Sequence, residues 1–135
     1  MHTAQHYDAK MSQIFFDQFN LTLPEYQFEI DINKSYASQL SSMCNNTASV
    51  FEDEKPEAVI VYGDTTTTIA ALLAAVKKSV PILHIEAGMR SNNTAMSEET
   101  NRVVCDQLSK LFFSPPKQPL TILLQKILIC RVCFL

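Results

Sequence analysis

Two predominantly apolar runs, residues 58–62 (AVIVY) and 80–85 (VPILHI), constrain the fold of this chain more than any other feature. In such a run both the odd and the even positions are mostly apolar, which is typical of a strand covered on both faces by helices in a parallel sheet. A helix is expected between them, over about residues 67–78. The chain is therefore predicted to alternate strand and helix.

The segments before these runs fit the same alternation. Met11, Ile14 and Phe19 recur at helical spacing, which predicts an amphipathic helix over 8–19 with one buried face. Apolar and polar residues then alternate over 27–32, the pattern of a strand with one buried face. A further amphipathic helix is expected over residues 35–54.

The segments after the two runs complete the pattern. A helix is expected over 98–110, begun by Ser97 as its N-cap, with Val103 and Leu108 pointing inward. A short last strand is expected over 111–114. This order predicts an α/β fold with a doubly wound parallel sheet and right-handed crossovers.

Length and charge limit the classes of function. A chain of 135 residues forms one domain. Its formal net charge of −3 gives no basic surface for a phosphate backbone, so no nucleic-acid partner is expected. The N-terminus lacks the apolar core of a signal peptide, which favours a cytoplasmic protein. The four cysteines lack the paired spacing of a zinc site, so neither metal nor cofactor is expected.

Acidic residues follow the two apolar runs. Asp64 comes after the first, next to Gly63, and Glu86 after the second, near Gly88; these are the only two glycines in the sequence. Because the carboxyl ends of parallel strands line one ligand-binding crevice, both carboxylates are expected to face one cleft. Glu98, at the start of the next helix, is expected on the same rim. Paired carboxylates in unlike environments are suited to general acid and base chemistry.

Simpler roles fit the same residues. Asp64 or a following threonine can serve only as a helix N-cap. Glu86 can form a surface pair with Arg90 four residues on. Glu98 can merely complement the dipole of its helix. Local spacing leaves these alternatives open.

Four ordered motifs carry a family resemblance. They are TAQH (3–6), VYGDTTTT (61–68), HIEAGMR (84–90) and EETNR (98–102). From about His2 to Pro115 the chain resembles the non-hydrolysing UDP-N-acetylglucosamine 2-epimerases. Residues 6–16 are also similar to the branch that includes epimerases of UDP-diacetamido-glucuronate. The resemblance therefore leaves two possible substrates, UDP-N-acetylglucosamine and UDP-diacetamido-glucuronate.

The resemblance implies a function. In this family a UDP-sugar binds between two Rossmann-like halves of a GT-B-type fold, and UDP is eliminated and re-added as C2 inverts. By motif match Asp64, Glu86 and Glu98 stand at the positions of catalytic carboxylates. The residues expected to position substrate are Gln5, His6, Arg90 and Arg102. The resemblance also implies that full-length members are homodimers.

The resemblance covers only part of such an enzyme. Residues 1–116 are interpreted as a partial N-terminal domain without its first strand and basic loop, and the second domain is absent. Residues 117–135 form an apolar tail that is expected not to be native family sequence, and membrane anchoring by it is not expected because the run is short and carries charges. A binding module without catalysis, or a pseudogene product that hardly folds, are the competing interpretations.

The change from patterned α/β sequence to the apolar tail leads us to expect a shifted reading frame after about Pro115. The DNA downstream, read in another frame, is then expected to encode the second domain. Sequencing the locus on both sides of the open frame tests this, and unrelated sequence in every frame would exclude the frameshift.

Overall fold

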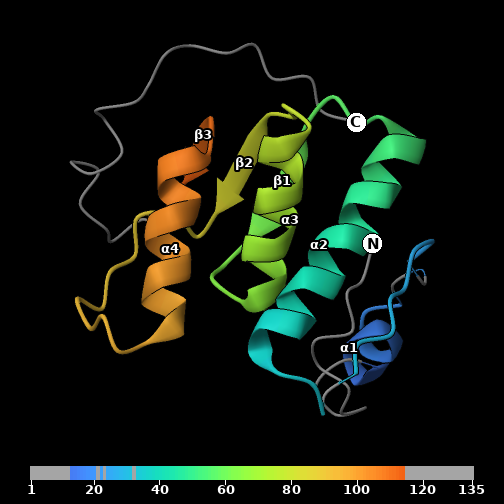
Figure 1. Ribbon diagram of the computed structural model, residues 1–135, viewed down its shortest axis with the longest axis horizontal. Helices are drawn as coiled ribbons and strands as arrows, with labels where there is room; N and C mark the ends of the chain where they lie inside the picture. The colour runs from blue at the N-terminus through green and yellow to red at the C-terminus, as the bar shows by residue number, and fades with distance from the viewer. Residues whose placement is uncertain (1–12, 21, 23, 32, 115–135) are drawn as a thin grey trace.

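The computed structural model describes residues 13–20, 22, 24–31 and 33–114 (Figure 1). Within this part the elements are α1 (Gln13–Gln18), α2 (Tyr36–Glu54), β1 (Val59–Tyr62), α3 (Thr66–Lys77), β2 (Ile82–Ile85), α4 (Ser97–Leu108) and β3 (Leu111–Phe113). From α2 onward, each helix and strand lies within a few residues of the position predicted from the sequence.

The three strands form one parallel sheet in the order β1-β2-β3. Val59 pairs with Ile82 and Tyr62 with Ile85, so β1 and β2 end at the same level. Because each strand returns to the sheet through a helix, all three carboxyl ends meet at one edge. The predicted α/β fold with a parallel sheet is confirmed.

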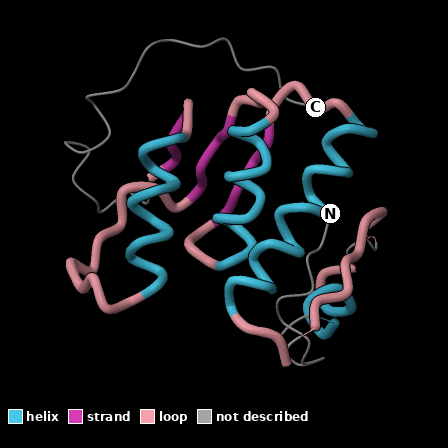
Figure 2. The backbone as a smooth tube through the Cα atoms, viewed as in Figure 1, coloured by secondary structure: helices cyan, strands magenta, loops and turns pink. Residues whose placement is uncertain are grey.

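The helices α2, α3 and α4 stand side by side in one layer, and the strands form the second (Figures 1 and 2). On β1, Val61 points toward the helices and is 4% exposed, whereas Ile60 and Tyr62 point away and are 59% and 64% exposed. The prediction that this strand is covered on both faces is therefore wrong for the described residues. Both β-α-β connections place their helices, α3 and α4, on the same face.

The core lies between this helix layer and the sheet. α3 occupies its centre, and its alanines allow close approach to α2, whose Phe51 packs in the same cluster. Hydroxyl groups fix the starts of both helices, because Ser35 caps α2 and Thr65 caps α3. The apolar stripe predicted for residues 35–54 is thus confirmed at its centre, although Tyr36 at its start is exposed.

Two predictions near the N-terminus are wrong. Residues 27–31 contain an isolated bridge at Gln27 and no strand. Just before them, the Tyr26 hydroxyl donates a hydrogen bond to Glu54 at 2.5 Å and joins the segment to the end of α2. That bond also raises the pKa of Tyr26 to about 12. Ile14 on α1 and Phe19 just after it are exposed rather than buried, since helical spacing identifies an apolar stripe without supplying a partner for it.

The orientation of α4 also differs from the prediction. Val103 and Leu108 are exposed, and the buried residues of the helix are Glu99, Asn101, Cys105 and Asp106. Met96 rather than Ser97 is the N-cap. The polar residues turn inward because their partners are backbone and side-chain groups of the loops that follow the strands.

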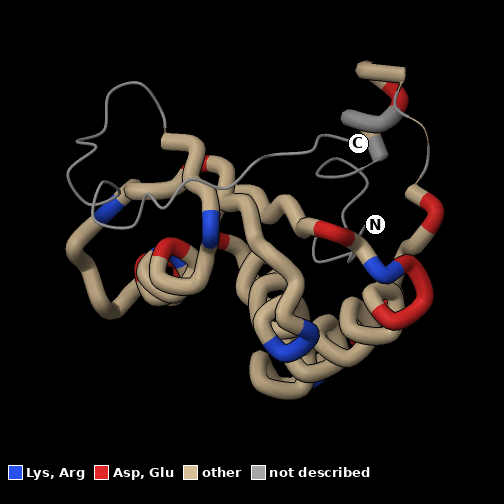
Figure 3. The backbone as a smooth tube through the Cα atoms, turned by 90° about the horizontal axis from the view of Figure 1, so that it is seen from above, with Lys and Arg blue, Asp and Glu red and all other residues tan. Residues whose placement is uncertain are grey.

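Charged residues of both signs are spread along the backbone (Figure 3). No helix in the described part of the chain is long and apolar enough to cross a membrane. The predictions for the apolar tail, including the boundary at residues 116 and 117, fall outside the described residues and stay predictions.

Two buried threonines provide a test of this packing. Thr47 on α2 has a buried hydroxyl without a hydrogen-bond partner among the described residues, whereas the Thr68 hydroxyl on α3 donates to the carbonyl of Tyr62 at 2.7 Å. We expect Thr47→Val to raise the free energy of unfolding by about 1 kcal/mol, since it removes an unsatisfied polar group. Urea denaturation followed by circular dichroism measures the change.

The matched control is Thr68→Val, which is expected to lower the free energy of unfolding by about 1–2 kcal/mol because it leaves the Tyr62 carbonyl without its donor. A loss of stability in Thr47→Val as large as in Thr68→Val would contradict this account of the core.

Candidate functional site

The candidate site lies at the edge of the sheet where the strands end. Gly63 and Asp64 follow β1, and Glu86 follows β2. The amide of Gly63 donates to the carbonyl of Ile85 at 3.0 Å, so the segment after β1 stays hydrogen-bonded to the end of β2. Asp64 and Glu86 are therefore neighbours at one edge, as the order of the strands predicts.

Glu86 adopts an unusual backbone conformation at this edge. Its φ is 67°, in the left-handed region that side chains other than glycine rarely occupy. Its carboxylate lies against Gly63, with Oε2 only 3.3 Å from where a Cβ would stand there. Gly63 itself has a φ of 68°, a backbone conformation that favours glycine, and a side chain there would also have to displace the Glu86 carboxylate by a few tenths of an ångström.

Asp64 is held by two residues of α4. Its carboxylate forms an ion pair with Arg102, and its backbone carbonyl accepts a hydrogen bond from the Asn101 side-chain amide at 2.7 Å. Asp64 is not the N-cap of α3, because Thr65 has that position. The first half of α4 is drawn to the end of β1 by these contacts, which places Arg102 at the site.

The two acids at the start of α4 have different surroundings. Glu98 is exposed; a hydrogen bond from its own amide, with one from the Ser97 hydroxyl, lowers the pKa of its carboxyl. Glu99 is buried and accepts bonds from the Ser91 amide at 2.7 Å and the Ser91 hydroxyl at 2.8 Å. Those bonds, the amide first, lower the pKa of Glu99. Glu98 is free to meet a ligand, whereas Glu99 holds the loop that follows Arg90.

Asp106, a buried residue of α4, makes the contacts that hold the end of β2 and the turn after it. One of its carboxylate oxygens lies 2.8 Å from Nδ1 of His84, and the other accepts from Arg90 at 2.7 Å and from the Gly88 amide at 3.0 Å. Nε2 of His84 donates to the carbonyl of Gly63 at 2.8 Å. His84 therefore connects Asp106 to the end of β1.

The pKa of Asp106 reflects these contacts. Burial alone would raise it, but the hydrogen bonds from His84, Arg90 and the Gly88 amide outweigh burial and hold the pKa below its ordinary value. The charged carboxylate therefore stabilises the fold at neutral pH. This stabilisation is lost as the pH falls below about 3.9, the ordinary value for aspartate, and through the lower pKa of the folded state.

At this edge the structure pairs Asp64 with Arg102 and sets the Glu86 carboxylate against Gly63, whereas Arg90 pairs with Asp106 and Glu98 lies on the first turn of α4. Arg90 pairs with Asp106 rather than with Glu86, so the simple surface pair considered from the sequence is wrong. Gln5 and His6 lie outside the described residues.

Sequence reasoning missed the supporting residues Glu99, Asn101 and Asp106, and it did not separate His84 from its motif. Their signal was polar spacing: residues 99, 102 and 106 recur at intervals of three and four on one face of a helix. The prediction for this helix rested on the apolar residues Val103 and Leu108, which are exposed.

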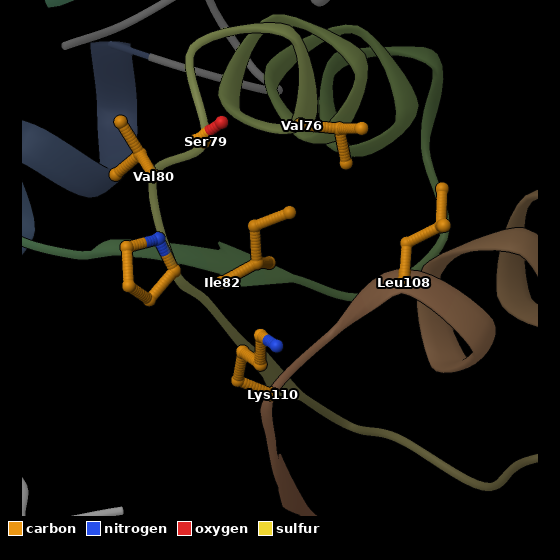
Figure 4. A pocket seen from close by; sticks show the side chains of 7 residues that line it. Val76, Ser79, Val80, Ile82, Leu108 and Lys110 are labelled. Atoms are coloured by element: carbon orange, nitrogen blue, oxygen red, sulfur yellow. The ribbon is translucent and has the colours of Figure 1, made fainter.

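A pocket of about 330 Å³ lies elsewhere, at the edge where the strands begin (Figure 4). Its lining includes Val76, Pro81 and Lys110, far along the strands from Asp64 and Glu86. A second hollow, of about 360 Å³, flanks the outer side of α4 beside Asn92 and Glu99. The chemistry-bearing side chains therefore belong to the strand-end rim and not to the pocket of Figure 4.

Comparison with known proteins identifies the family. The family described as UDP-N-acetylglucosamine 2-epimerase matches residues 1–128 of the chain. The chain belongs to this epimerase family. The sequence resemblance, carried by the four ordered motifs, is therefore confirmed.

Individual members of the epimerase family are similar over most of this chain. The UDP-2,3-diacetamido-2,3-dideoxy-D-glucuronate 2-epimerase of Pseudomonas aeruginosa is 46% identical over 117 residues, which are 87% of this chain and 33% of that protein. The UDP-N-acetylglucosamine 2-epimerase of Methanococcus maripaludis is 44% identical over 117 residues, 87% of this chain and 32% of the relative.

A solved structure agrees with the fold. The UDP-GlcNAc 2-epimerase of Methanocaldococcus jannaschii, in complex with UDP-GlcNAc and UDP, superimposes with a TM-score of 0.86 at 38% identity, covering 93% of this chain and 34% of that one. The present chain spans about a third of the length of the epimerases that it matches.

The strained turn of this epimerase-family chain yields a prediction. Glu86→Gly removes a left-handed conformation that costs a side chain about 1–3 kcal/mol. After allowing for the greater freedom of glycine in the unfolded chain, we expect the free energy of unfolding to rise by about 0.5–1 kcal/mol. Thermal unfolding followed by circular dichroism measures it.

Glu57→Gly is the control, because Glu57 is an exposed loop acid without a positive φ. It is expected to be neutral or slightly destabilising. Equal destabilisation by both substitutions would show that the Glu86 backbone stores no strain.

Proposed function

We propose that this chain is the N-terminal, carboxylate-bearing part of a UDP-sugar 2-epimerase, with UDP-N-acetylglucosamine as the substrate. One observation carries the proposal: in a chain of this family, Asp64 and Glu86 follow paired strands at one edge, with Glu98 on the adjoining helix turn. The solved relative that binds UDP-GlcNAc and UDP supports a nucleotide sugar as the ligand.

Inversion at C2 requires a base that removes the C2 proton and an acid that delivers one to the opposite face. As the proton leaves, the C1–O bond to UDP breaks and a glycal-like intermediate forms; the reverse steps restore that bond. The carboxylates fit this task because their surroundings differ. Asp64 is paired with Arg102, Glu86 lies against the backbone of Gly63, and Glu98 is exposed.

The cations of the rim have a different role in this proposal. Arg102 holds Asp64, and Arg90 is committed to Asp106, so both position the acids. The charge of the departing diphosphate then requires donors from the rest of a full-length enzyme. Gln5 and His6 remain proposed substrate contacts, and a cytoplasmic homodimer remains the proposed state of such an enzyme.

A second candidate substrate is favoured by one comparison. The Pseudomonas aeruginosa relative, 46% identical, is a UDP-2,3-diacetamido-2,3-dideoxy-D-glucuronate 2-epimerase. Its sugar shares the acetamido group at C2, so the same acid and base chemistry applies. Both UDP-sugars therefore belong in the assay.

We expect the chain alone to leave UDP-N-acetylglucosamine unchanged. Catalysis needs the sugar held to within roughly 0.5 Å, which an open rim does not achieve. Each missing donor for the leaving group is commonly worth about 3–4 kcal/mol, or a factor of roughly 100–1,000 in rate. Proton NMR of the C2 epimer and of free UDP measures turnover, and turnover that Asp64→Asn abolishes would show a complete site in this chain.

The carboxylates are tested by grafting residues 13–114 onto the Methanococcus maripaludis enzyme in place of the matching segment. We expect the chimera to epimerise UDP-N-acetylglucosamine, and Asp64→Asn, Glu86→Gln and Glu98→Gln each to reduce kcat at least about 100-fold. Glu57→Gln, on an exposed loop, is the matched control. A folded chimera that binds the UDP-sugar without turnover would favour a binding module over an enzyme, and one that does not fold would favour a pseudogene product.

A further inference from the structure

The turn at residues 86–90 is held against its own conformational preference. Glu86 takes a left-handed φ of 67°, and Gly88 one of 82°. A side chain keeps such a conformation only where neighbouring contacts fix the backbone on both sides of it. The contacts that do so here identify what controls the direction of the Glu86 carboxylate.

Before Glu86, β2 and the bond from the Gly63 amide to the Ile85 carbonyl fix the chain. After Glu86, the Ala87 amide donates to the carbonyl of Phe113 at 3.1 Å. The rest of the turn is held by one side chain, Asp106. It accepts from the Gly88 amide at 3.0 Å and from the Arg90 guanidinium at 2.7 Å.

Asp106 also acts on the far side of the Glu86 carboxylate. Through His84, which it contacts at 2.8 Å, it holds a donor against the Gly63 carbonyl. Gly63 is the residue on which the Glu86 carboxylate rests. One buried carboxylate thus fixes both the turn that carries Glu86 and the backbone against which Glu86 lies.

We propose that Asp106 is a positioning residue of the epimerase site, which sets the orientation of the Glu86 carboxylate by binding Gly88, Arg90 and His84 together. Its importance for the reaction rests on the proposed function, whereas the positioning itself does not. Asp106 lies one helical turn beyond Arg102, which holds Asp64, so a single face of α4 positions both strand-end carboxylates.

The two glycines make this testable by NMR, since a chain labelled with [15N]glycine shows only the amides of Gly63 and Gly88. In the unchanged background, Glu86→Gln is expected to shift the Gly63 resonance, because the carboxylate lies against that residue. In an Asp106→Ser background the same substitution is expected to shift it by less than half as much. A serine hydroxyl is too short to join the turn to His84.

The comparison separates positioning from stability. If Asp106 only stabilised the fold, Asp106→Ser would lower the melting temperature and leave the effect of Glu86→Gln on Gly63 unchanged, which would overturn the proposal. Asp53→Asn, on the exposed end of α2, is the control background and is expected to preserve the full shift.

A second measurement needs no variant, and it decides the matter if Asp106→Ser does not fold. In the unchanged chain the Gly88 amide is expected to exchange with deuterium at least tenfold or so more slowly than an unstructured amide, because it donates to a buried carboxylate. Unprotected exchange at Gly88 would overturn the proposal. Neither measurement uses a UDP-sugar, so an inactive chimera would leave this result standing, and a failed NMR test would leave the proposed function open.

Discussion

The polar face of α4 is the element on which the rest of the site depends. Asn101 and Arg102 hold the end of β1, Asp106 holds the turn after β2, and Glu99 holds the loop that follows it. These groups are buried or half-buried, and a buried acceptor or donor that loses its partner costs about 1–3 kcal/mol. The loops at the strand ends therefore cannot move away from α4 without a penalty at several points.

This arrangement explains how a strained residue persists at the rim. The left-handed backbone at Glu86 is unfavourable by itself, yet the Glu86 carboxylate lies against Gly63 in this conformation. The contacts made by Asp106 and by Ala87 offset that strain. A more relaxed turn would be more stable and would lose the acid from its place, which is the usual conflict between stability and function.

The sequence predicted the parallel sheet because β1 and β2 are apolar runs whose surroundings leave few alternatives. It also predicted the positions of Asp64 and Glu86, since parallel strands bring their ends to one edge. It failed where burial is polar. Val103 and Leu108 were predicted to be buried because they are hydrophobic, but Glu99 and Asp106 take the inner face because Ser91 and His84 supply their hydrogen-bond partners. The periodicity of a sequence identifies which residues share one face of a helix, but it does not identify the groups against which that face packs.

Among the described residues, the hydrogen bonds and ion pairs that order this rim join residues between 63 and 113, so contacts within this part of the chain hold the acids in place. The described part of the rim lacks a cation that is free to bind a diphosphate. Arg102 and Arg90, the cations described within it, are neutralised by Asp64 and Asp106 and have little charge left for a diphosphate. Under the proposed function, a rim with ordered acids and committed cations is suited to proton transfer at a sugar carbon, and donors from another part of a full-length enzyme stabilise the leaving group. This chain covers about a third of the epimerases it matches.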